Sequence, residues 1–152
     1  MKNAIKIFAP ATLTNLCVGH DSLGVALESF GDDLIIGKSD LTGIHFRNIL
    51  GYKAQTDKLK ESIEESLKAF LKVVKKEYQG LEINIQKRIP GSSGIGSSSC
   101  VVAALFGVNR LLKTGLSLKE LLSFSVLGYS QKDKQSFFAH AVPCMLGGMT
   151  ST

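Results

Sequence analysis

Apolar residues recur at three- and four-residue steps through residues 56–78, and this spacing predicts the clearest helix in the chain. The expected buried face consists of Leu59, Ile63, Leu67, Phe70, Leu71, Val74 and Tyr78. Lysines and glutamates are interleaved on the other positions, as on a solvated helix face that carries i,i+4 ion pairs. The pattern therefore predicts a helix with one side in the core and the other in water.

Short segments with alternating or concentrated apolar residues predict strands at 2–8, 32–38, 43–50 and 81–89. The first strand is expected to end at Ala9-Pro10-Ala11-Thr12, because proline cannot donate a hydrogen bond to a neighbouring strand. Residues 13–24 then read as a loop in which Asn15, His20 and Asp21 carry the chemically active side chains. Turn residues that satisfy the backbone and residues that bind a ligand are both open interpretations of Asn15 and Asp21.

The second half of the chain reads mainly as helix. The apolar run from Val101 to Leu112 predicts a buried helix at about 97–113, ended by Thr114-Gly115. Ser117 and Glu120 form the spacing of a capping box, which opens another helix that runs to about Leu127. Residues 128–134 are polar and give no clear pattern, and residues 137–149 are apolar again.

The stretch between the 81–89 strand and the 97–113 helix carries the strongest chemical signal. From Gly91 to Cys100 its only large side chain is Ile95. Glycines let a ligand approach the backbone, and the following helix presents unpaired N–H groups, so the stretch predicts a phosphate site. A tight turn with a serine cap is the alternative, but a turn requires far fewer small residues. The full stretch is Pro90, Gly91, Ser92, Ser93, Gly94, Ile95, Gly96, Ser97, Ser98, Ser99 and Cys100.

This stretch matches neither of two common nucleotide-binding motifs. No Lys-Ser/Thr pair follows its last glycine, as a Walker A loop requires, and Ser99 stands where the dinucleotide fingerprint has its third glycine.

Length and composition exclude several classes of protein. A chain of 152 residues with 44% hydrophobic and 20% charged residues fits one soluble globular domain. No apolar run reaches the length of a membrane span, and the first residues do not form a signal peptide. Three widely spaced cysteines favour a reducing cytoplasm and form no metal-binding spacing. The net charge of +5 comes with glutamates beside the lysines, which argues against a nucleic-acid partner.

Three segments resemble one enzyme family, in the family's own order. The segment with Ala9-Pro10-Ala11-Thr12, Asn15, Gly19, Asp21 and Leu23-Gly24 resembles the N-terminal signature of homoserine kinases. The segment Pro90–Cys100, centred on Gly94-Ile95-Gly96-Ser97-Ser98, resembles the phosphate loop of the galacto/homoserine/mevalonate/phosphomevalonate kinase superfamily. Pro143-Cys144 and Leu146-Gly147-Gly148 are similar to a later family segment.

The resemblance implies an α+β fold of the ribosomal-protein-S5 domain-2 type, with a left-handed βαβ unit and a Gly/Ser-rich phosphate loop. Residues 1–152 would be the kinase N-terminal domain, without the family's C-terminal domain. Pro90 to Cys100 would bind the phosphates of ATP, Ser97 or Ser98 would approach Mg²⁺, and Asn15 and Asp21 would hold homoserine. The implied reaction transfers the γ-phosphoryl group to the homoserine side-chain hydroxyl in threonine biosynthesis, and no catalytic residue is assigned.

The chain also departs from the family pattern. Ser92 replaces a glycine, His20 replaces a phenylalanine, and the glutamate that binds Mg²⁺ is missing from Gly128-Tyr129-Ser130-Gln131, where Asp133 is the nearest carboxylate. The family's His-x-Asp-Asn-Val-x-Pro segment survives as His140-Ala141-Val142-Pro143, and the roles of His20 and His140 stay open. The missing glutamate and the absence of the family's second domain favour the alternative of a catalytically silent kinase-like domain that binds nucleotide or a partner. The intact phosphate loop and N-terminal signature favour a homoserine kinase.

The absence of a second domain also predicts uncovered apolar surface around Phe137, Phe138 and Met145 to Met149. Such a surface would favour self-association, and a homo-oligomer is therefore expected.

Overall fold

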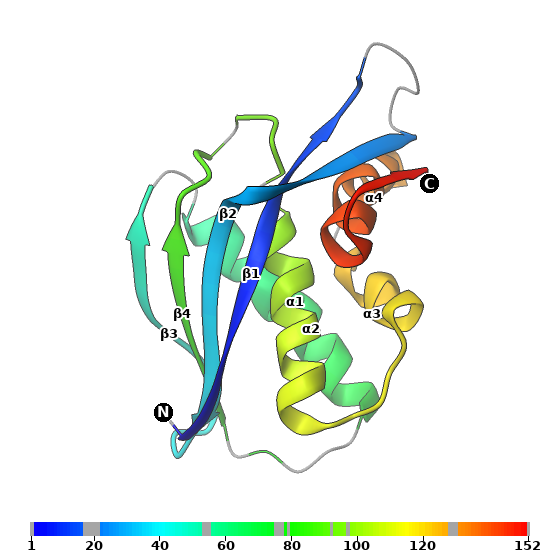
Figure 1. Cartoon of the computed structure of the whole chain (residues 1–152). Helices are drawn as coiled ribbons and strands as arrows, with labels where there is room; N and C mark the ends of the chain where they lie inside the picture. The colour runs from blue at the N-terminus through cyan, green and yellow to red at the C-terminus, as the bar shows by residue number, and fades with distance from the viewer. Residues whose placement is uncertain are drawn as a thin grey trace.

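A single mixed sheet, covered on one face by helices, organises the chain (Figure 1). The computed structural model describes residues 2–16, 22–52, 56–74, 78, 80–91, 93–96, 98–127 and 131–151. Its elements follow in the order β1 (Lys2–Thr14), β2 (Leu23–Ser39), β3 (Gly43–Gly51), α1 (Thr56–Val74), β4 (Gly80–Lys87), α2 (Ser99–Leu112), α3 (Leu118–Ser125), α4 (Gln131–Leu146) and β5 (Met149–Ser151). This is the α+β class that the family resemblance implied.

Within the described residues the sheet has five strands in the order β1-β2-β4-β3, with β5 paired to β2. β1 and β2 are antiparallel, as are β2 and β4, whereas β3 and β4 are parallel. Since α1 connects the parallel strands β3 and β4, these three elements form the predicted βαβ unit. The left hand of that crossover stays a prediction.

The first two strands are longer than predicted, and the expected stop at residues 9–12 was wrong. β1 continues to Thr14, with a register shift between Pro10 and Thr12. Proline is tolerated on edge strands and at such irregularities, and β1 lies at one edge of the strand order β1-β2-β4-β3. Gly31 faces Pro10 across the pair, and a Cβ at Gly31 would lie 2.3 Å from the carbonyl oxygen of Ala9. β1 and β2 therefore continue as a pair beyond β4 and β3, and β5 pairs with β2 in this extended part of the sheet (Figure 1).

The hydrophobic core lies between the sheet and helices α1 and α2. The predicted apolar face of α1 is confirmed, because Ile63, Leu67 and Phe70 are fully buried. Phe70 contacts Phe124 of α3 edge to face, with 5.6 Å between the ring centroids. The strands contribute Leu34, Ile36, Leu81, Ile83 and Ile85, and α2 contributes most of its side chains, from Cys100 to Leu112.

The ends of two helices show how local sequence sets their limits. The capping box at α3 is confirmed: the Ser117 side chain accepts the backbone N–H of Glu120, and the Glu120 carboxylate accepts the backbone N–H of Ser117 at 2.8 Å. The end of α2 differs from the prediction, because the left-handed residue at its C-cap is Lys113, with φ of +50°. Gly115 also has positive φ, two residues beyond this cap.

The sequence pattern did not reveal α4. Its first turn is polar, Pro143 lies in its last turn, and its apolar residues do not gather on one face. The backbone N–H of Gly147 donates to the carbonyl of Pro143 at 2.8 Å and closes the helix. Figure 1 shows α4 beside the extended part of β1 and β2, where β5 also pairs with β2.

The predicted apolar surface near α4 is only partly present. Leu146 and Met149 are 58% and 69% exposed, but Phe137 is buried in the core. Self-association through this region stays a prediction. Among the described helices, none combines the length and the hydropathy that a membrane span requires.

Candidate phosphate-binding site

The Gly/Ser-rich loop connects the end of β4 to the first turn of α2, as the sequence predicted. Gly94 and Gly96 both have positive φ, at +74° and +83°, a region that side chains disfavour. Ser93 is exposed and its hydroxyl donates to the Pro90 carbonyl at 2.7 Å. The shape of the loop therefore depends on the positive φ of its glycines and on the hydrogen bond from Ser93 to Pro90.

The loop is held against the far end of β1 by Thr12. The backbone N–H of Thr12 donates to the carbonyl of Ile95 at 3.0 Å. Gly96, the next residue of the loop, is buried so closely that a Cβ there would lie 2.1 Å from Thr12 Oγ1. A glycine is thus required at this position for both its φ and its size.

His140 of α4 completes the same junction. Its Nδ1 lies 2.8 Å from Thr12 Oγ1, and its Nε2 lies 3.4 Å from Thr14 Oγ1. A Cβ at Gly96 would also come within 3.3 Å of His140 Nδ1. Three segments far apart in the sequence (the end of β1, the loop and α4) therefore meet around one buried glycine.

The N-terminus of α2 supplies the electrostatics of the site. The first N–H groups of a helix have no partner within it, and the helix dipole places partial positive charge there. The side chain of the N-cap residue Ser98 makes no hydrogen bond that caps the helix. Its hydroxyl is therefore not used in capping. At this end the Ser99 N–H donates to the Gly96 carbonyl at 3.2 Å, and the Val101 N–H donates to the Ser98 carbonyl at 3.0 Å. The helix dipole, the Ser98 hydroxyl and the remaining N–H groups are therefore what the site offers to an anion such as phosphate.

The two described cysteines near the loop do not form a nucleophilic site. Burial raises the pKa of the Cys100 thiol well above its usual value, and it raises that of Cys144 to about 12. Cys100 is fully buried, and its thiol donates to Asp32 at 3.1 Å. Both thiols stay protonated at neutral pH, so neither is expected to act as a nucleophile.

Comparison with known proteins identifies the family. Residues 62–148, which include the loop and all of α2, α3 and α4, match the model described as GHMP kinases N terminal domain. The chain belongs to this family. Its match extends over more than half of the sequence, from α1 to the residues just before β5.

Several relatives that match this GHMP kinase domain are named homoserine kinase. A homoserine kinase from Methanococcus vannielii is 33% identical over 97% of the chain, which covers 50% of that relative. The crystal structure of homoserine kinase from Cytophaga hutchinsonii superposes with a TM-score of 0.85 at 32% identity, over 99% of this chain and 49% of that one. Mevalonate kinase from L. major, at 16% identity and a TM-score of 0.62, shares the fold. The chain spans about half the length of these relatives.

The structure brings part of the predicted site together. Asn15 is exposed, with φ of +59°, and it follows the β1 segment whose Thr12 contacts the loop. Asp21, Ser92 and Ser97 lie outside the described residues, as does His20. The Cys100 thiol donates a hydrogen bond to Asp32. Of Cys100, only the backbone can therefore contribute to phosphate binding. These assignments stay predictions.

Sequence reasoning missed the place of Thr12 and His140 in the site. The only signal was that His140 survives in a family segment that is otherwise altered. Its contact with Thr12 spans 128 positions and depends on α4, which the hydrophobic pattern did not predict.

The described residues contain no side-chain cluster that would hold magnesium without a bound nucleotide. Among them, no three His, Cys, Asp or Glu side chains lie close enough together to hold a metal ion. Of the two predicted serine ligands, Ser98 alone is described. Magnesium in nucleotide sites usually has one or two carboxylate ligands besides the phosphates, so we derive no step through the metal.

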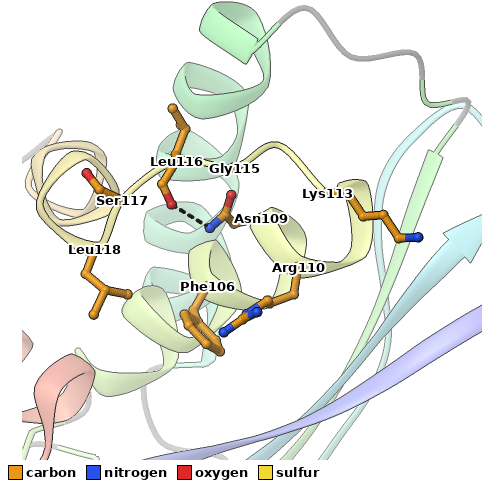
Figure 2. Close-up of a pocket in the computed structure, with 8 residues that line it drawn as sticks. All are labelled: Phe106, Asn109, Arg110, Lys113, Gly115, Leu116, Ser117 and Leu118. Atoms are coloured by element: carbon orange, nitrogen blue, oxygen red, sulfur yellow. Dashed lines mark hydrogen bonds between the residues drawn. The ribbon is translucent and has the colours of Figure 1, made fainter.

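A separate pocket of about 610 Å³ lies at the other end of α2. Figure 2 shows its lining, in which the Arg110 guanidinium stacks on Phe106 and Asn109 donates to the Leu116 carbonyl at 3.0 Å. Phe106 is the lining residue of α2 nearest the loop, and about 10 Å of helix separates it from the start of α2 at Ser99. None of the predicted site residues lines it.

Proposed function

We propose that the chain forms the nucleotide-binding half of a homoserine kinase, which transfers the γ-phosphoryl group of ATP to the homoserine hydroxyl. The observation that carries this proposal is that proteins named homoserine kinase match 95–97% of the chain, at 29–33% identity. The site geometry supports it, because a Gly/Ser-rich loop and a helix N-terminus meet the segment that precedes Asn15.

The roles that we propose for the chain's own residues are those of binding and orientation. The backbone around Gly94 and Gly96, the first turn of α2 and the Ser98 hydroxyl bind the triphosphate. Asn15 and Asp21 hold the amino-acid end of homoserine. In phosphoryl transfer, positioning and the neutralisation of phosphate charge supply most of the acceleration, so these contacts are the chemistry that this half provides.

ATP is the proposed phosphoryl donor, and Mg²⁺ is expected to accompany it, as is usual for kinases. The proposed setting is the cytoplasm, in threonine biosynthesis, where both substrates are small molecules. In this proposal residues 1–152 act as one N-terminal kinase domain.

A second candidate function is a kinase-like domain that binds nucleotide without transferring phosphate. It is favoured by the sequence, in which Gly128-Tyr129-Ser130-Gln131 lacks the glutamate that the family pattern has there. A phosphotransfer assay with ATP, Mg²⁺ and homoserine separates the two functions. Formation of O-phosphohomoserine supports the kinase, whereas nucleotide binding without product supports the silent domain.

Asn15→Ala tests the proposed amino-acid site. Loss of a hydrogen bond to a charged ligand is expected to weaken homoserine binding by about tenfold or more. Asn15 is exposed and has φ of +59°, so we expect the free energy of unfolding to fall by about 1–2 kcal/mol, mainly because alanine disfavours a left-handed conformation. Titration of homoserine in the presence of a non-hydrolysable ATP analogue measures the first effect, and thermal unfolding measures the second.

Asn15→Gly is the matched control, because glycine adopts positive φ without strain but also lacks the amide. It should bind homoserine as weakly as the alanine variant. If it instead restores full binding, Asn15 serves the backbone and not the substrate.

A further inference from the structure

Asp32 lies directly beneath the phosphate loop, and its carboxylate is completely buried. Its Oδ1 accepts the backbone N–H groups of Arg88 at 2.6 Å and Ile89 at 2.8 Å. Its Oδ2 accepts the Lys87 ammonium and the Cys100 thiol. Both oxygens are therefore occupied, and all the donors belong to residues next to the loop.

These four donors lie on both sides of the loop. Lys87 is the last residue of β4, and Arg88 and Ile89 are the next two, so Oδ1 holds the segment that enters the loop. Cys100 is the second residue of α2, so Oδ2 holds the first turn of the helix that leaves it. One side chain of β2 thus fixes the distance between the end of β4 and the start of α2.

Stability alone does not explain this arrangement. A buried ion pair such as Asp32–Lys87 loses hydration on both charges, and well-packed apolar residues commonly serve the fold equally well. A carboxylate differs from an apolar side chain in accepting two adjacent backbone N–H groups beyond the end of a strand. What it provides here is a fixed geometry at a helix N-terminus.

We propose that Asp32 is a positioning residue for the phosphate loop: it sets the approach of the first turn of α2 to the nucleotide phosphates by tying both ends of the loop to β2. This rests on the proposed nucleotide-binding function. Asp32 is separated from the phosphates by the loop that it holds, so its effect on them is indirect.

The test removes the carboxylate without leaving a buried charge. Asp32→Asn/Lys87→Met keeps one acceptor for the two backbone N–H groups, but loses the acceptor that faces Cys100. Asp32→Ala/Lys87→Met loses both. Asp33→Asn is the matched control, because the carboxylate of Asp33 pairs with the side chains of Lys6 and Arg88, and no contact of it with the loop backbone is described.

Hydrogen exchange of the nucleotide-free chain gives the first readout. We expect exchange in the first turn of α2 to rise by about tenfold in both double variants, the effect of one charged hydrogen bond, and exchange at residues 88–89 to rise in the alanine variant. Exchange in α1 and β4 should not change, and the Asp33→Asn protein should match the parent chain. Unchanged exchange around the loop, or an equal rise throughout the chain, would overturn the proposal.

Titration with a non-hydrolysable ATP analogue gives the second readout, at a temperature where all variants are folded. Affinity should fall by about tenfold in the double variants and stay unchanged in Asp33→Asn. If affinity is retained while the loop exchanges faster, the positioning role is wrong. If the parent chain binds no nucleotide, the proposed function fails, and the exchange result alone decides whether Asp32 orders the loop.

Discussion

Gly96→Ala is expected to reduce nucleotide affinity by about 100-fold or more. The added Cβ would lie 2.1 Å from Thr12 Oγ1 and 3.3 Å from His140 Nδ1, and alanine would have to adopt φ of +83°. The left-handed conformation costs about 1–2 kcal/mol, and crowding in a packed site costs about 1–3 kcal/mol. Together these displace the loop from β1, and titration with an ATP analogue measures the loss.

Gly94→Ala is the matched control for this effect. Gly94 has a similar φ of +74°, but a Cβ there meets no atom within 4 Å. Only the backbone strain is then added, which corresponds to a loss of about tenfold. Equal affinities in the two variants would show that the junction of Thr12, Gly96 and His140 does not shape the site.

The second large effect is on stability. Phe70→Ala should lower the free energy of unfolding by about 3–5 kcal/mol, because this α1 side chain is fully buried in the core and contacts Phe124 edge to face. A chain of this size has a total stability of about 5–15 kcal/mol, so the variant is expected to be marginally folded. Denaturant unfolding, followed by circular dichroism, measures the change.

Val73→Ala provides the comparison on the same helix. Val73 is 62% exposed, so the substitution should change the free energy of unfolding by no more than about 0.5 kcal/mol. A large loss in this variant, or a small one in Phe70→Ala, would contradict the packing of α1 against the sheet.

The sequence was most informative where one local pattern decides the structure. The face of α1 could be predicted because Ile63, Leu67 and Phe70 repeat with the period of a helix, and the start of α3 because Ser117 and Glu120 cap it within one turn. The loop between β4 and α2 could be placed because small residues are concentrated between two apolar segments.

The same local patterns could not predict contacts between residues that are far apart in the sequence. Pro10 reads as a strand end, but pairing with Gly31 carries β1 onward to Thr14. The polar start of α4 and Pro143 concealed the helix that places His140 against Thr12. Asp32 read as part of an ordinary strand, because its partners lie 55 to 68 positions away.

The family signature provided what hydrophobic patterning could not. It associated the segment around Asn15 with the phosphate loop, and the structure places the end of β1 against that loop through Thr12 and Ile95. The predicted roles of Asp21, Ser92 and Ser97 depend on the signature alone, since these residues lie outside the described part of the chain.

Isothermal titration of the chain with a non-hydrolysable ATP analogue, with and without Mg²⁺, tests the central claim most directly. The account predicts saturable binding that weakens by about 100-fold or more in Gly96→Ala, since both the loop and the N-terminus of α2 contribute to it. Absence of binding in both conditions would contradict the account, and the loop would then serve only to connect β4 to α2.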